Sequence, residues 1–257
     1  MPVVILAGGL GTRLKEETEY RPKPMVKIGH QPILWHIMKL YSHHGFRNFI
    51  VCLGYKGEMI REYFYHYKLY TGDVLVDVNA RETRTLRASP DEVDWKVILA
   101  DTGKDTMTGG RVKRIQDYVG SDEFFVTYGD GVADVDIGAA LAAHRRAGTI
   151  GTVTGVHPVS RFGELVTEGD LVREFQEKQV AHDYVNGGFF VFRRKFFDYL
   201  EGGDATVLEQ APLRRLAAEG QLSMYRHDGY WQCMDTFRES ELLNGLWSSG
   251  KAPWKVW

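Results

Sequence analysis

The sequence predicts an α/β protein with a Rossmann-like, doubly wound mixed sheet that is mostly parallel and has antiparallel C-terminal additions. Two observations predict the parallel part. Short β-branched, apolar runs alternate with amphipathic helical patterns, and the first run ends at a glycine-rich turn. A third observation predicts the additions, because the last strand-like runs follow one another too closely for helices between all of them.

The first part of the chain shows the alternation most clearly. Residues 3–7 are wholly apolar and precede two glycines, which predicts a buried first strand. Apolar residues at helical spacing follow Pro32 and stop before Gly45, which predicts a helix over 33–41. The same criteria predict a strand at 49–53, a helix at 59–67 and a third strand at 74–78. These elements form a βαβαβ order.

The rest of the chain continues this pattern and then changes. Strands are predicted at 96–100, 124–128 and 150–156, and helices at 110–118 and 137–147. The runs 165–166, 171–175 and 185–192 are the expected antiparallel additions. After a final helix at 237–247, the tail carries Trp254 and Trp257, which we expect to pack on a neighbouring subunit or to cover their own chain.

The composition argues against several classes of protein. There are 32 Lys and Arg and 34 Asp and Glu residues, and the resulting net charge of −2 argues against nucleic acid and anionic membrane as partners. We expect neither a signal peptide nor a membrane span, because no basic leader and no run of about 18 apolar residues occurs. Cys52 and Cys233 lack metal-ligand spacing, which argues against structural zinc and suits a reducing cytoplasm.

A glycine-rich segment, 6–14, follows the first strand at the edge where open α/β sheets bind ligands. Its three glycines let backbone N–H groups approach an anion closely. Leu14 stands where a dinucleotide fingerprint has its last glycine, and Arg13-Leu14 stands where a P-loop has Lys-Ser/Thr, so neither motif is present. Alone, the segment fits a tight turn as well as it fits a phosphate site.

Two cations are within reach of this loop. Arg13 lies in the loop, and Lys23 lies between Pro22 and Pro24, which hold it in a stiff, extended segment. An isolated surface lysine is usually only solvated, whereas a fixed lysine beside a glycine-rich loop suits triphosphate chemistry. We therefore interpret Arg13 and Lys23 as candidate catalytic cations.

Several motifs in order along the chain resemble those of a known family. They are the segment 6–14, Arg21-Pro22-Lys23-Pro24-Met25-Val26, Asp101-Thr102-Gly103, Thr106-Met107-Thr108-Gly109-Gly110-Arg111, Thr127-Tyr128-Gly129-Asp130-Gly131, Asn186-Gly187-Gly188-Phe189-Phe190-Val191 and Met234-Asp235-Thr236. The first two resemble the signature of sugar-1-phosphate nucleotidylyltransferases, and the whole set resembles the glucose-1-phosphate cytidylyltransferase branch. The resemblance continues to Lys251-Ala252-Pro253-Trp254-Lys255, so it covers nearly the whole chain.

The resemblance implies transfer of a cytidylyl group from CTP to α-D-glucose 1-phosphate, giving CDP-glucose and pyrophosphate. The attacking phosphate oxygen is already anionic, so the reaction needs no general base and no covalent intermediate. Charge repulsion opposes the attack, and Mg²⁺, Arg13, Lys23 and the loop amides would relieve it. Use of another pyrimidine triphosphate or another phosphorylated acceptor is an alternative, and a non-catalytic sugar-nucleotide-binding subunit is a further one.

The resemblance assigns Asp130 and Asp235 as the two carboxylates that hold the Mg²⁺ cofactor. This ion usually takes one or two protein carboxylates and completes its shell with substrate phosphates and water. From the residues alone, Asp130 reads as part of an Asp-Gly turn and Asp235 as the N-cap of the last helix. The predicted catalytic residues are Arg13, Lys23, Asp130 and Asp235.

The resemblance also assigns residues to each substrate. The nucleotide-binding set is Leu6, Ala7, Gly8, Gly9, Gly11, Thr12, Arg13, Lys23, Thr108, Arg111 and Gly129. The sugar-phosphate-binding set is Gly163, Glu177, Lys178, Asn186 and Gly187. The donor-only guanidinium of Arg111 suits the adjacent O2 and N3 acceptors of cytosine, whereas uracil has an N–H at the second position. Gln179 stands where the family usually has proline, so the chain departs from the family pattern beside two of the residues assigned to the sugar phosphate.

We expect one nucleotidylyltransferase domain over 1–257, because no repeat or linker interrupts the chain. Residues 1–135 would form the nucleotide-binding part, and residues 136–257 the sugar-phosphate-binding and oligomerisation part. The expected partners are CTP, a sugar 1-phosphate and further copies of the same chain. The resemblance suggests a homo-oligomer of six.

Overall fold

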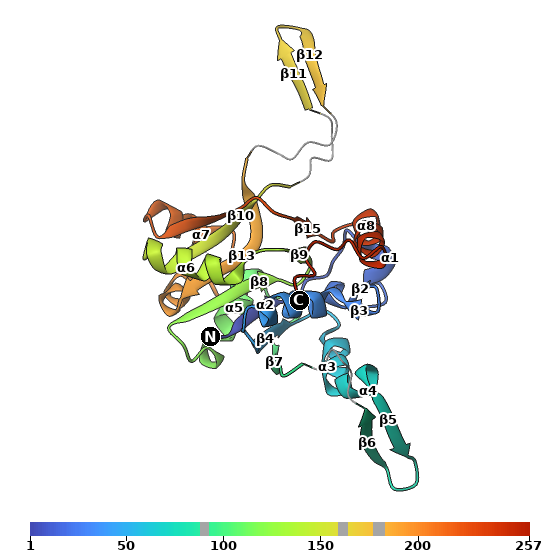
Figure 1. Cartoon of the computed structure of the whole chain (residues 1–257). Coiled ribbons are helices and arrows are strands. Elements are labelled where there is room, and N and C mark those ends of the chain that lie inside the picture. Colours follow the sequence, from blue (N-terminus) through green and yellow to red (C-terminus); the bar gives the residue numbers. More distant parts are fainter. Residues whose placement is uncertain (88–92, 159–163, 177–182) are drawn as a thin grey trace.

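The computed structural model describes residues 1–87, 93–158, 164–176 and 183–257. At its centre is a seven-stranded sheet made of β1 (Val3–Leu6), β4 (Asn48–Leu53), β7 (Lys96–Asp101), β8 (Glu123–Tyr128), β10 (Gly151–Val156), β13 (Val185–Arg193) and β14 (Leu222–His227). The strand order is β14-β10-β13-β8-β1-β4-β7 (Figure 1). Only β13 runs antiparallel to its neighbours among these seven strands. The predicted fold class, a mostly parallel mixed sheet with an antiparallel C-terminal strand, is confirmed.

The remaining elements surround or extend this sheet. The α-helices are α1 (Lys15–Thr18), α2 (Ile33–His43), α3 (Gly57–Tyr65), α4 (Tyr67–Thr71), α5 (Thr108–Arg114), α6 (Ile137–Ala147), α7 (Ala211–Ala218) and α8 (Phe237–Ser248). Short 3-10 helices lie at Lys23–Met25, Gln116–Tyr118, Arg194–Tyr199 and Gly203–Ala205. Separate strand pairs are β2 (Lys27–Ile28) with β3 (Gln31–Pro32), β5 (Asp73–Asp77) with β6 (Glu82–Arg87), β9 (Gly131–Ala133) with β15 (Trp231–Cys233), and β11 (Glu164–Glu168) with β12 (Leu171–Gln176). None of the described helices is both long enough and apolar enough to cross a membrane.

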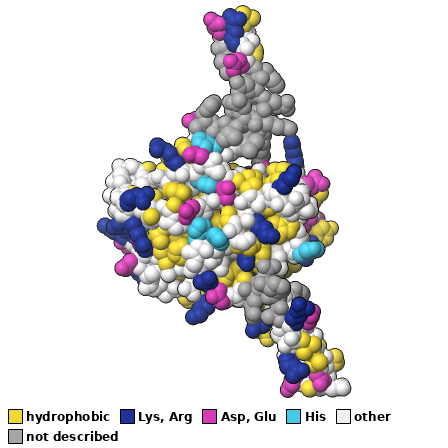
Figure 2. Space-filling view, viewed as in Figure 1, with side chains coloured by type: hydrophobic (Ala, Val, Ile, Leu, Met, Phe, Trp, Pro, Cys, Tyr) yellow, Lys and Arg dark blue, Asp and Glu magenta, His cyan; other side chains and the backbone are white. Residues whose placement is uncertain are grey.

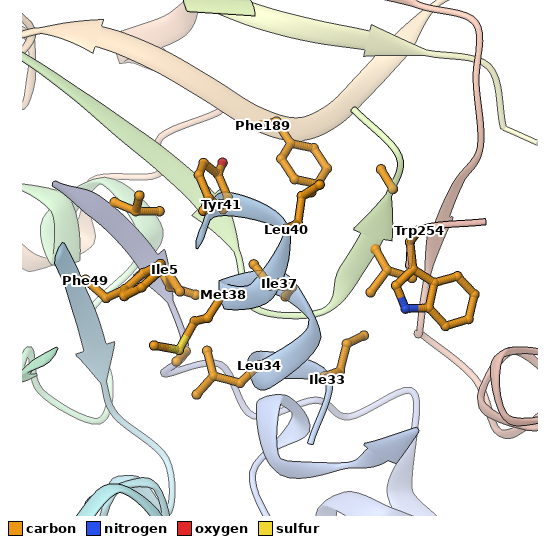
Figure 3. Close-up of a cluster of buried hydrophobic side chains, with 14 of the residues drawn as sticks. Ile5, Ile33, Leu34, Ile37, Met38, Leu40, Tyr41, Phe49, Phe189 and Trp254 are labelled. Carbon is orange, nitrogen blue, oxygen red and sulfur yellow. The ribbon is translucent and has the colours of Figure 1, made fainter. Parts of the chain in front are cut away.

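The two faces of the sheet pack against separate hydrophobic cores, because successive side chains of a strand point to opposite faces. Ile5 of β1 belongs to one core and its neighbour Val4 to the other. Helix α2 fills the first core with residues such as Leu34, and Figure 3 shows them beneath the sheet. Leu216 of α7 packs in the second core. Helices therefore cover both faces, as a doubly wound fold requires.

The strand order reverses at β1, and this reversal positions the site. From β1 the sheet continues through β4 to β7 on one side, whereas β8 lies on the other side. Leu6 and Tyr128, the last residues of β1 and β8, are partners in the parallel register. The loops after these two strands consequently leave the sheet at one edge, where ligands bind in open α/β folds.

Residues 74–78 lie in and just beyond a strand, but the prediction that this strand joins the central sheet is wrong. It belongs to β5, which pairs with β6 in a hairpin that projects from the body (Figure 1). The strand that extends the sheet beyond β4 is β7, so the hairpin is an insertion between α4 and β7. Its apolar side chains are exposed, with Val76 at 58% and Leu86 at 58%.

The expected C-terminal additions are partly wrong. Strands at 165–166 and 171–175 do form, but β11 and β12 make a second separate hairpin and do not extend the central sheet. Strand β13 is confirmed as an antiparallel member of the sheet. Sequence reasoning missed β14, which pairs parallel with β10 at the edge.

The C-terminal tail covers its own chain, which was one of the two expectations. Trp254 is 1% exposed and belongs to the first core. Its Nε1 donates to Nδ1 of His36 at 3.3 Å, and its ring stacks on Tyr230. Trp257 lies edge-on to Trp35, with ring centroids 5.8 Å apart. The tail therefore holds helix α2 in place from outside.

Candidate active site

Two cavities meet at the edge of the sheet where β1 and β8 end. The first, of about 600 Å³, is lined by the glycine-rich loop, by Lys23 and by residues from 104 to 111. The second, of about 310 Å³, is lined by residues of β8, β13 and β15 with the turns that follow them. Arg13, Tyr128 and Asp130 line both cavities, so the two join at these side chains.

The glycine-rich loop packs closely against neighbouring side chains, and two of its glycines make this close approach possible. A Cβ at Gly8 would lie 2.2 Å from the guanidinium of Arg111, so only glycine fits under that side chain. Gly11 has a φ of +63°, and a Cβ there would also meet Thr18 at 2.6 Å. The loop therefore bends tightly around the first cavity. All eleven residues of the predicted nucleotide-binding set line this cavity.

Lys23 lies between the two predicted metal-binding carboxylates. Its ammonium donates to Oδ2 of Asp130 at 2.6 Å and also to Oδ1 of Asp235. Arg13 contacts the other oxygen of Asp235 at 2.8 Å from its Nη1. The side chains of Lys23 and Asp235 are each 11% exposed, whereas that of Arg13 is 71% exposed. The structure thus brings all four predicted catalytic residues together.

The pKa of Lys23 reflects this arrangement. Burial alone would lower the pKa of its ammonium, but the charges and hydrogen bonds of the two carboxylates, Asp130 first, raise it above its ordinary value. Lys23 is therefore a fixed positive charge at neutral pH. Such a charge opposes the mutual repulsion of two carboxylates that point at one spot.

Strand pairing explains how two aspartates so distant in sequence meet. Asp130 precedes β9 and Asp235 follows β15, and these two strands pair with Cys233 opposite Gly131. The backbone N–H of Met234 also donates to the carbonyl of Asp130 at 2.8 Å. The alternative interpretation of Asp235 as a helix cap is wrong, because α8 is capped by Thr236 in a capping box with Glu239.

The donor set fits a hard divalent cation. Two carboxylates from different elements converge on one cationic group, the ammonium of Lys23, and so define a place for positive charge. In the described residues, no three His, Cys, Asp or Glu side chains gather as a metal cluster. A pair of carboxylates with room for substrate phosphates is the arrangement that Mg²⁺ favours, whereas zinc usually needs three or four protein ligands.

Arg111 lines the nucleotide cavity, but its guanidinium also bonds to the protein. Nη1 donates to the carbonyls of Leu53 and Gly103, at 2.9 and 2.7 Å, and to Oγ1 of Thr102 at 2.8 Å. Nη2 donates to the carbonyls of Gly8 and Lys104, at 3.1 and 3.2 Å. The side chain ties the glycine-rich loop to the ends of β4 and β7. Its expected hydrogen bonds to cytosine remain a prediction.

The described part of the sugar-phosphate set lies in the second cavity. Asn186 and Gly187 line it. Nε1 of Trp231 donates to the carbonyl of Gly187 at 2.8 Å, and the backbone N–H of Gly188 donates to Oδ1 of Asn186 at 2.8 Å. Of the predicted residues, Gly163, Glu177 and Lys178 lie outside the described residues, as does Gln179.

Sequence reasoning missed several lining residues. Lys104, Asp105 and Met107 line the nucleotide cavity, and Trp231 lines the sugar side. Tyr128 lines both cavities although it was only part of a quoted motif. Its position as the last residue of β8, two residues before Asp130, was the available signal, because residues at strand ends face the ligand edge.

The two cysteines do not supply a nucleophile. Burial, followed by the charge of Asp235, raises the pKa of Cys233 to about 12, and burial raises that of Cys52 to about 12. Both side chains are therefore neutral thiols at physiological pH. The site is built from fixed charges, which suits a reaction whose nucleophile arrives already ionised.

Comparisons with known proteins agree with this geometry. A family profile described as Nucleotidyl transferase matches residues 2–237. The chain is 51% identical over 261 aligned residues to the glucose-1-phosphate cytidylyltransferase of Salmonella typhi, with 100% of both chains covered. It is 43% identical to the probable glucose-1-phosphate cytidylyltransferase of Bacillus subtilis (strain 168), again over 100% of both.

Solved structures show the same fold at lower identity. HddC from Yersinia pseudotuberculosis has a TM-score of 0.69 at 23% identity, covering 96% of this chain and 99% of that chain. A UDP-glucose pyrophosphorylase complexed with UDP-glucose has a TM-score of 0.66 at 14% identity, covering 97% and 98%. At these identities the likeness establishes the fold alone.

Proposed function

This chain belongs to the nucleotidyl transferase family and within it to the glucose-1-phosphate cytidylyltransferases, and we propose that it makes CDP-glucose and pyrophosphate from CTP and α-D-glucose 1-phosphate. The observation that carries this proposal is the convergence of two cations and two carboxylates where the two cavities join. That junction provides a place for a triphosphate on one side and for an acceptor phosphate on the other.

In this mechanism the fixed charges of the site lower the barrier mainly by reducing the repulsion between the two substrates. The phosphate oxygen of the sugar attacks the α-phosphorus of CTP, and pyrophosphate leaves from the opposite side. Two unit charges of like sign at 4 Å repel by about 4 kcal/mol at an effective dielectric constant of 20, so repulsion between the substrates is a large part of the barrier. Lys23 and Arg13 reduce this repulsion, and the backbone N–H groups of the glycine-rich loop hold the phosphates.

Asp130 and Asp235 are the residues that would hold Mg²⁺. When bound, the ion adds positive charge beside the phosphates and orients them. Divalent metals are general in this family, and the identity of the metal as Mg²⁺ is our proposal. It is supported by the oxygen-only pair and by the space left for substrate oxygens.

We assign the two substrates to the two cavities. Residues 1–135 supply the lining of the nucleotide cavity, and residues 136–257 supply Asp235 together with Asn186 and Gly187 on the sugar side. Both parts contribute strands to one seven-stranded sheet, which supports treating 1–257 as a single domain. We retain Gly163, Glu177 and Lys178 as proposed sugar-phosphate residues.

We also propose that the protein is a homo-oligomer. The β5–β6 hairpin exposes Leu75, Val76, Val78 and Leu86, and Figure 2 shows hydrophobic side chains along it. A further cavity, of about 730 Å³, lies between α3, α4 and β7 and contains none of the predicted site residues. Burial of such apolar surface against a second copy is a common reason for its presence.

We expect the protein to work in the cytoplasm. The site consumes a nucleoside triphosphate, which is abundant there. Cys52 and Cys233 are both free, as suits a reducing compartment.

The direct test is identification of the product. Purified protein is incubated with CTP, α-D-glucose 1-phosphate and Mg²⁺, and the mixture is analysed by mass spectrometry and for pyrophosphate. We expect CDP-glucose and pyrophosphate in equal amounts, and neither product when EDTA removes the metal. Product without added divalent metal, or pyrophosphate without a sugar nucleotide, would contradict the proposal.

A further inference from the structure

One carboxylate, Glu209, accepts hydrogen bonds from hydroxyl groups in both substrate cavities. Oγ1 of Thr108 donates to its Oε2 at 2.8 Å, and Oη of Tyr128 donates to its Oε1. Thr108 lines the nucleotide cavity and Tyr128 lines both cavities. Glu209 itself lies behind these side chains, just before α7, and the mechanism above gives it no task.

These bonds fix the direction in which Thr108 can act. A hydroxyl has one proton, and that of Thr108 points at Glu209. The same oxygen accepts the backbone N–H of Leu208 at 2.9 Å. A carboxylate offers only acceptors, so turning the proton of Thr108 away would leave Glu209 without its partner. Thr108 therefore presents a lone pair, and no donor, to the nucleotide.

This polarity distinguishes the two pyrimidines. Cytosine carries an amino donor at C4, whereas uracil carries a carbonyl acceptor there. A group that can only accept is bound by the first and repelled by the second. We propose that the oxygen of Thr108 faces the C4 substituent of the bound base, and that Glu209 is a positioning residue for base choice because it locks Thr108 as an acceptor there, which favours CTP over UTP. The inference rests on the proposed function and names the residue behind its nucleotide specificity.

The second bond of Glu209 extends the same effect to the sugar side. Because Tyr128 donates its proton to Glu209, the Tyr128 oxygen can accept a hydrogen bond from Nδ2 of Asn186, at 3.2 Å. The side-chain oxygen of Asn186 is taken by the N–H of Gly188. The amide of Asn186 is thereby held in one orientation, with its second N–H available to the sugar cavity.

A glutamine at this position would test the polarity without changing the shape. Its amide has one acceptor oxygen and one donor nitrogen, so it cannot accept from both hydroxyls. One of the two hydroxyl protons must then turn elsewhere. When that proton is the one on Thr108, the hydroxyl can donate to O4 of uracil.

The experiment compares CTP and UTP in the parent and in Glu209→Gln, Glu209→Ala, Thr108→Val and the double variant of Glu209→Ala with Thr108→Val. Affinities are measured by calorimetry without sugar phosphate, and kcat/KM values are measured with it. We expect the parent to prefer CTP. The preference should fall about 10-fold or more in Glu209→Ala and in Thr108→Val, equivalent to about 1.4 kcal/mol. Glu209→Gln should lower the preference or raise KM for the sugar phosphate, according to which hydroxyl its amide oxygen accepts from. The double variant should fall no further than Thr108→Val, because Glu209 acts on base choice only through Thr108.

Three further variants separate this role from a merely structural one. Thr108→Ser keeps the hydroxyl and should restore the preference. Tyr128→Phe should raise KM for the sugar phosphate and leave the CTP to UTP ratio near that of the parent. Glu219→Gln is a matched control, because Glu219 accepts from Tyr199 at 2.6 Å and from Arg215 at 2.9 Å on the surface, and it should change neither quantity.

The inference is overturned if the parent binds CTP and UTP equally, or if Glu209→Ala, which removes both acceptor oxygens, folds and keeps the parent ratio. Additive losses in the double variant would also contradict it. Thr108→Val remains a test even if substitution of Glu209 prevents folding. An unchanged CTP to UTP ratio in Thr108→Val would show that Thr108 does not recognise the base. Absence of CDP-glucose from the parent would instead refute the proposed function, while the binding ratios would still report on Glu209.

Discussion

Lys23 balances the charges of the site at the scale of single residues. Its ammonium is nearly buried and contacts two carboxylates, so the three groups depend on one another. Removing one partner of such a buried set leaves uncompensated charge, which is costly. This dependence distinguishes Lys23 from an ordinary surface lysine, the reading that the sequence had left open.

We expect Asp130→Asn and Asp235→Asn each to lower turnover by at least about 10²-fold, because each carboxylate contributes charge that would hold the metal at the phosphates. Steady-state pyrophosphate release at saturating Mg²⁺ provides the measurement, with circular dichroism to check folding. Asp117→Asn, at an exposed position, is the matched control. Near-normal turnover in either site variant would refute the shared metal site.

We expect Arg111→Ala to lower stability and to reduce kcat/KM for CTP more than for UTP, because UTP cannot use the same pair of hydrogen bonds. The five oxygen atoms that its guanidinium contacts would lose a charged donor, and a hydrogen bond to a charged group contributes about 1.5–3 kcal/mol. Denaturant unfolding and kinetics with both nucleotides measure the two effects. Parallel losses for the two nucleotides would show that Arg111 supports the loop and does not recognise the base.

At the scale of elements, helix α2 and the C-terminal tail form one packed unit around His36. Nδ1 of His36 accepts from Trp254, so Nε2 carries the proton and donates to the carbonyl of Ile28 at 3.0 Å. Burial lowers the pKa of His36 to about 4 from an ordinary value of 6.5. The folded protein therefore holds this ring neutral.

This shift predicts how stability depends on pH. Below pH 6.5 His36 is protonated in the unfolded chain, whereas in the folded chain it stays neutral until about pH 4. Its contribution to unfolding free energy should therefore decrease by about 3 kcal/mol as pH falls through this window. Urea unfolding at several pH values tests this. His36→Gln should flatten the slope and His43→Gln should not, and equal slopes in all three proteins would contradict the account.

Much of the element order could be predicted from the sequence, and the failures have physical reasons. The buried strands β1, β4 and β8 are continuous apolar runs, which local patterns reveal. The run at 74–78 is also mostly apolar, with Asp77 as its one charged residue, yet its pairing partner is β6, whose charged and threonine residues are typical of a loop. Strand β14 was missed because polar residues such as Ser223 and Arg226 interrupt its pattern.

The site divides in the same way. Residues in local motifs, such as Lys23 and Asp130, could be predicted because their neighbours in sequence also define the site. Glu209 could not, because it lies 101 positions from Thr108 and 81 from Tyr128, within no recognisable motif. Only folding brings these three residues together.

At the scale of the whole molecule, the two hairpins extend well beyond the sheet (Figure 1). We expect light scattering to give a mass several times 29.3 kDa, with six copies as the number that the resemblance implies. Leu75→Asp with Leu86→Asp should lower this mass, because both side chains are exposed apolar groups on the β5–β6 hairpin. Leu242→Asp, on exposed α8, is the control. A parent protein whose mass by light scattering is that of a monomer would contradict the prediction.

The central claim is that the junction of the two cavities joins CTP to a sugar 1-phosphate. It is tested most directly by pyrophosphate release across a grid of nucleotides and acceptors. The grid pairs the four ribonucleoside triphosphates and dTTP with the 1-phosphates of glucose, galactose and mannose, in the presence of Mg²⁺. We predict the highest kcat/KM for CTP with α-D-glucose 1-phosphate, and a background rate for Asp235→Asn. No release with CTP, or faster release with another nucleotide, would contradict the account.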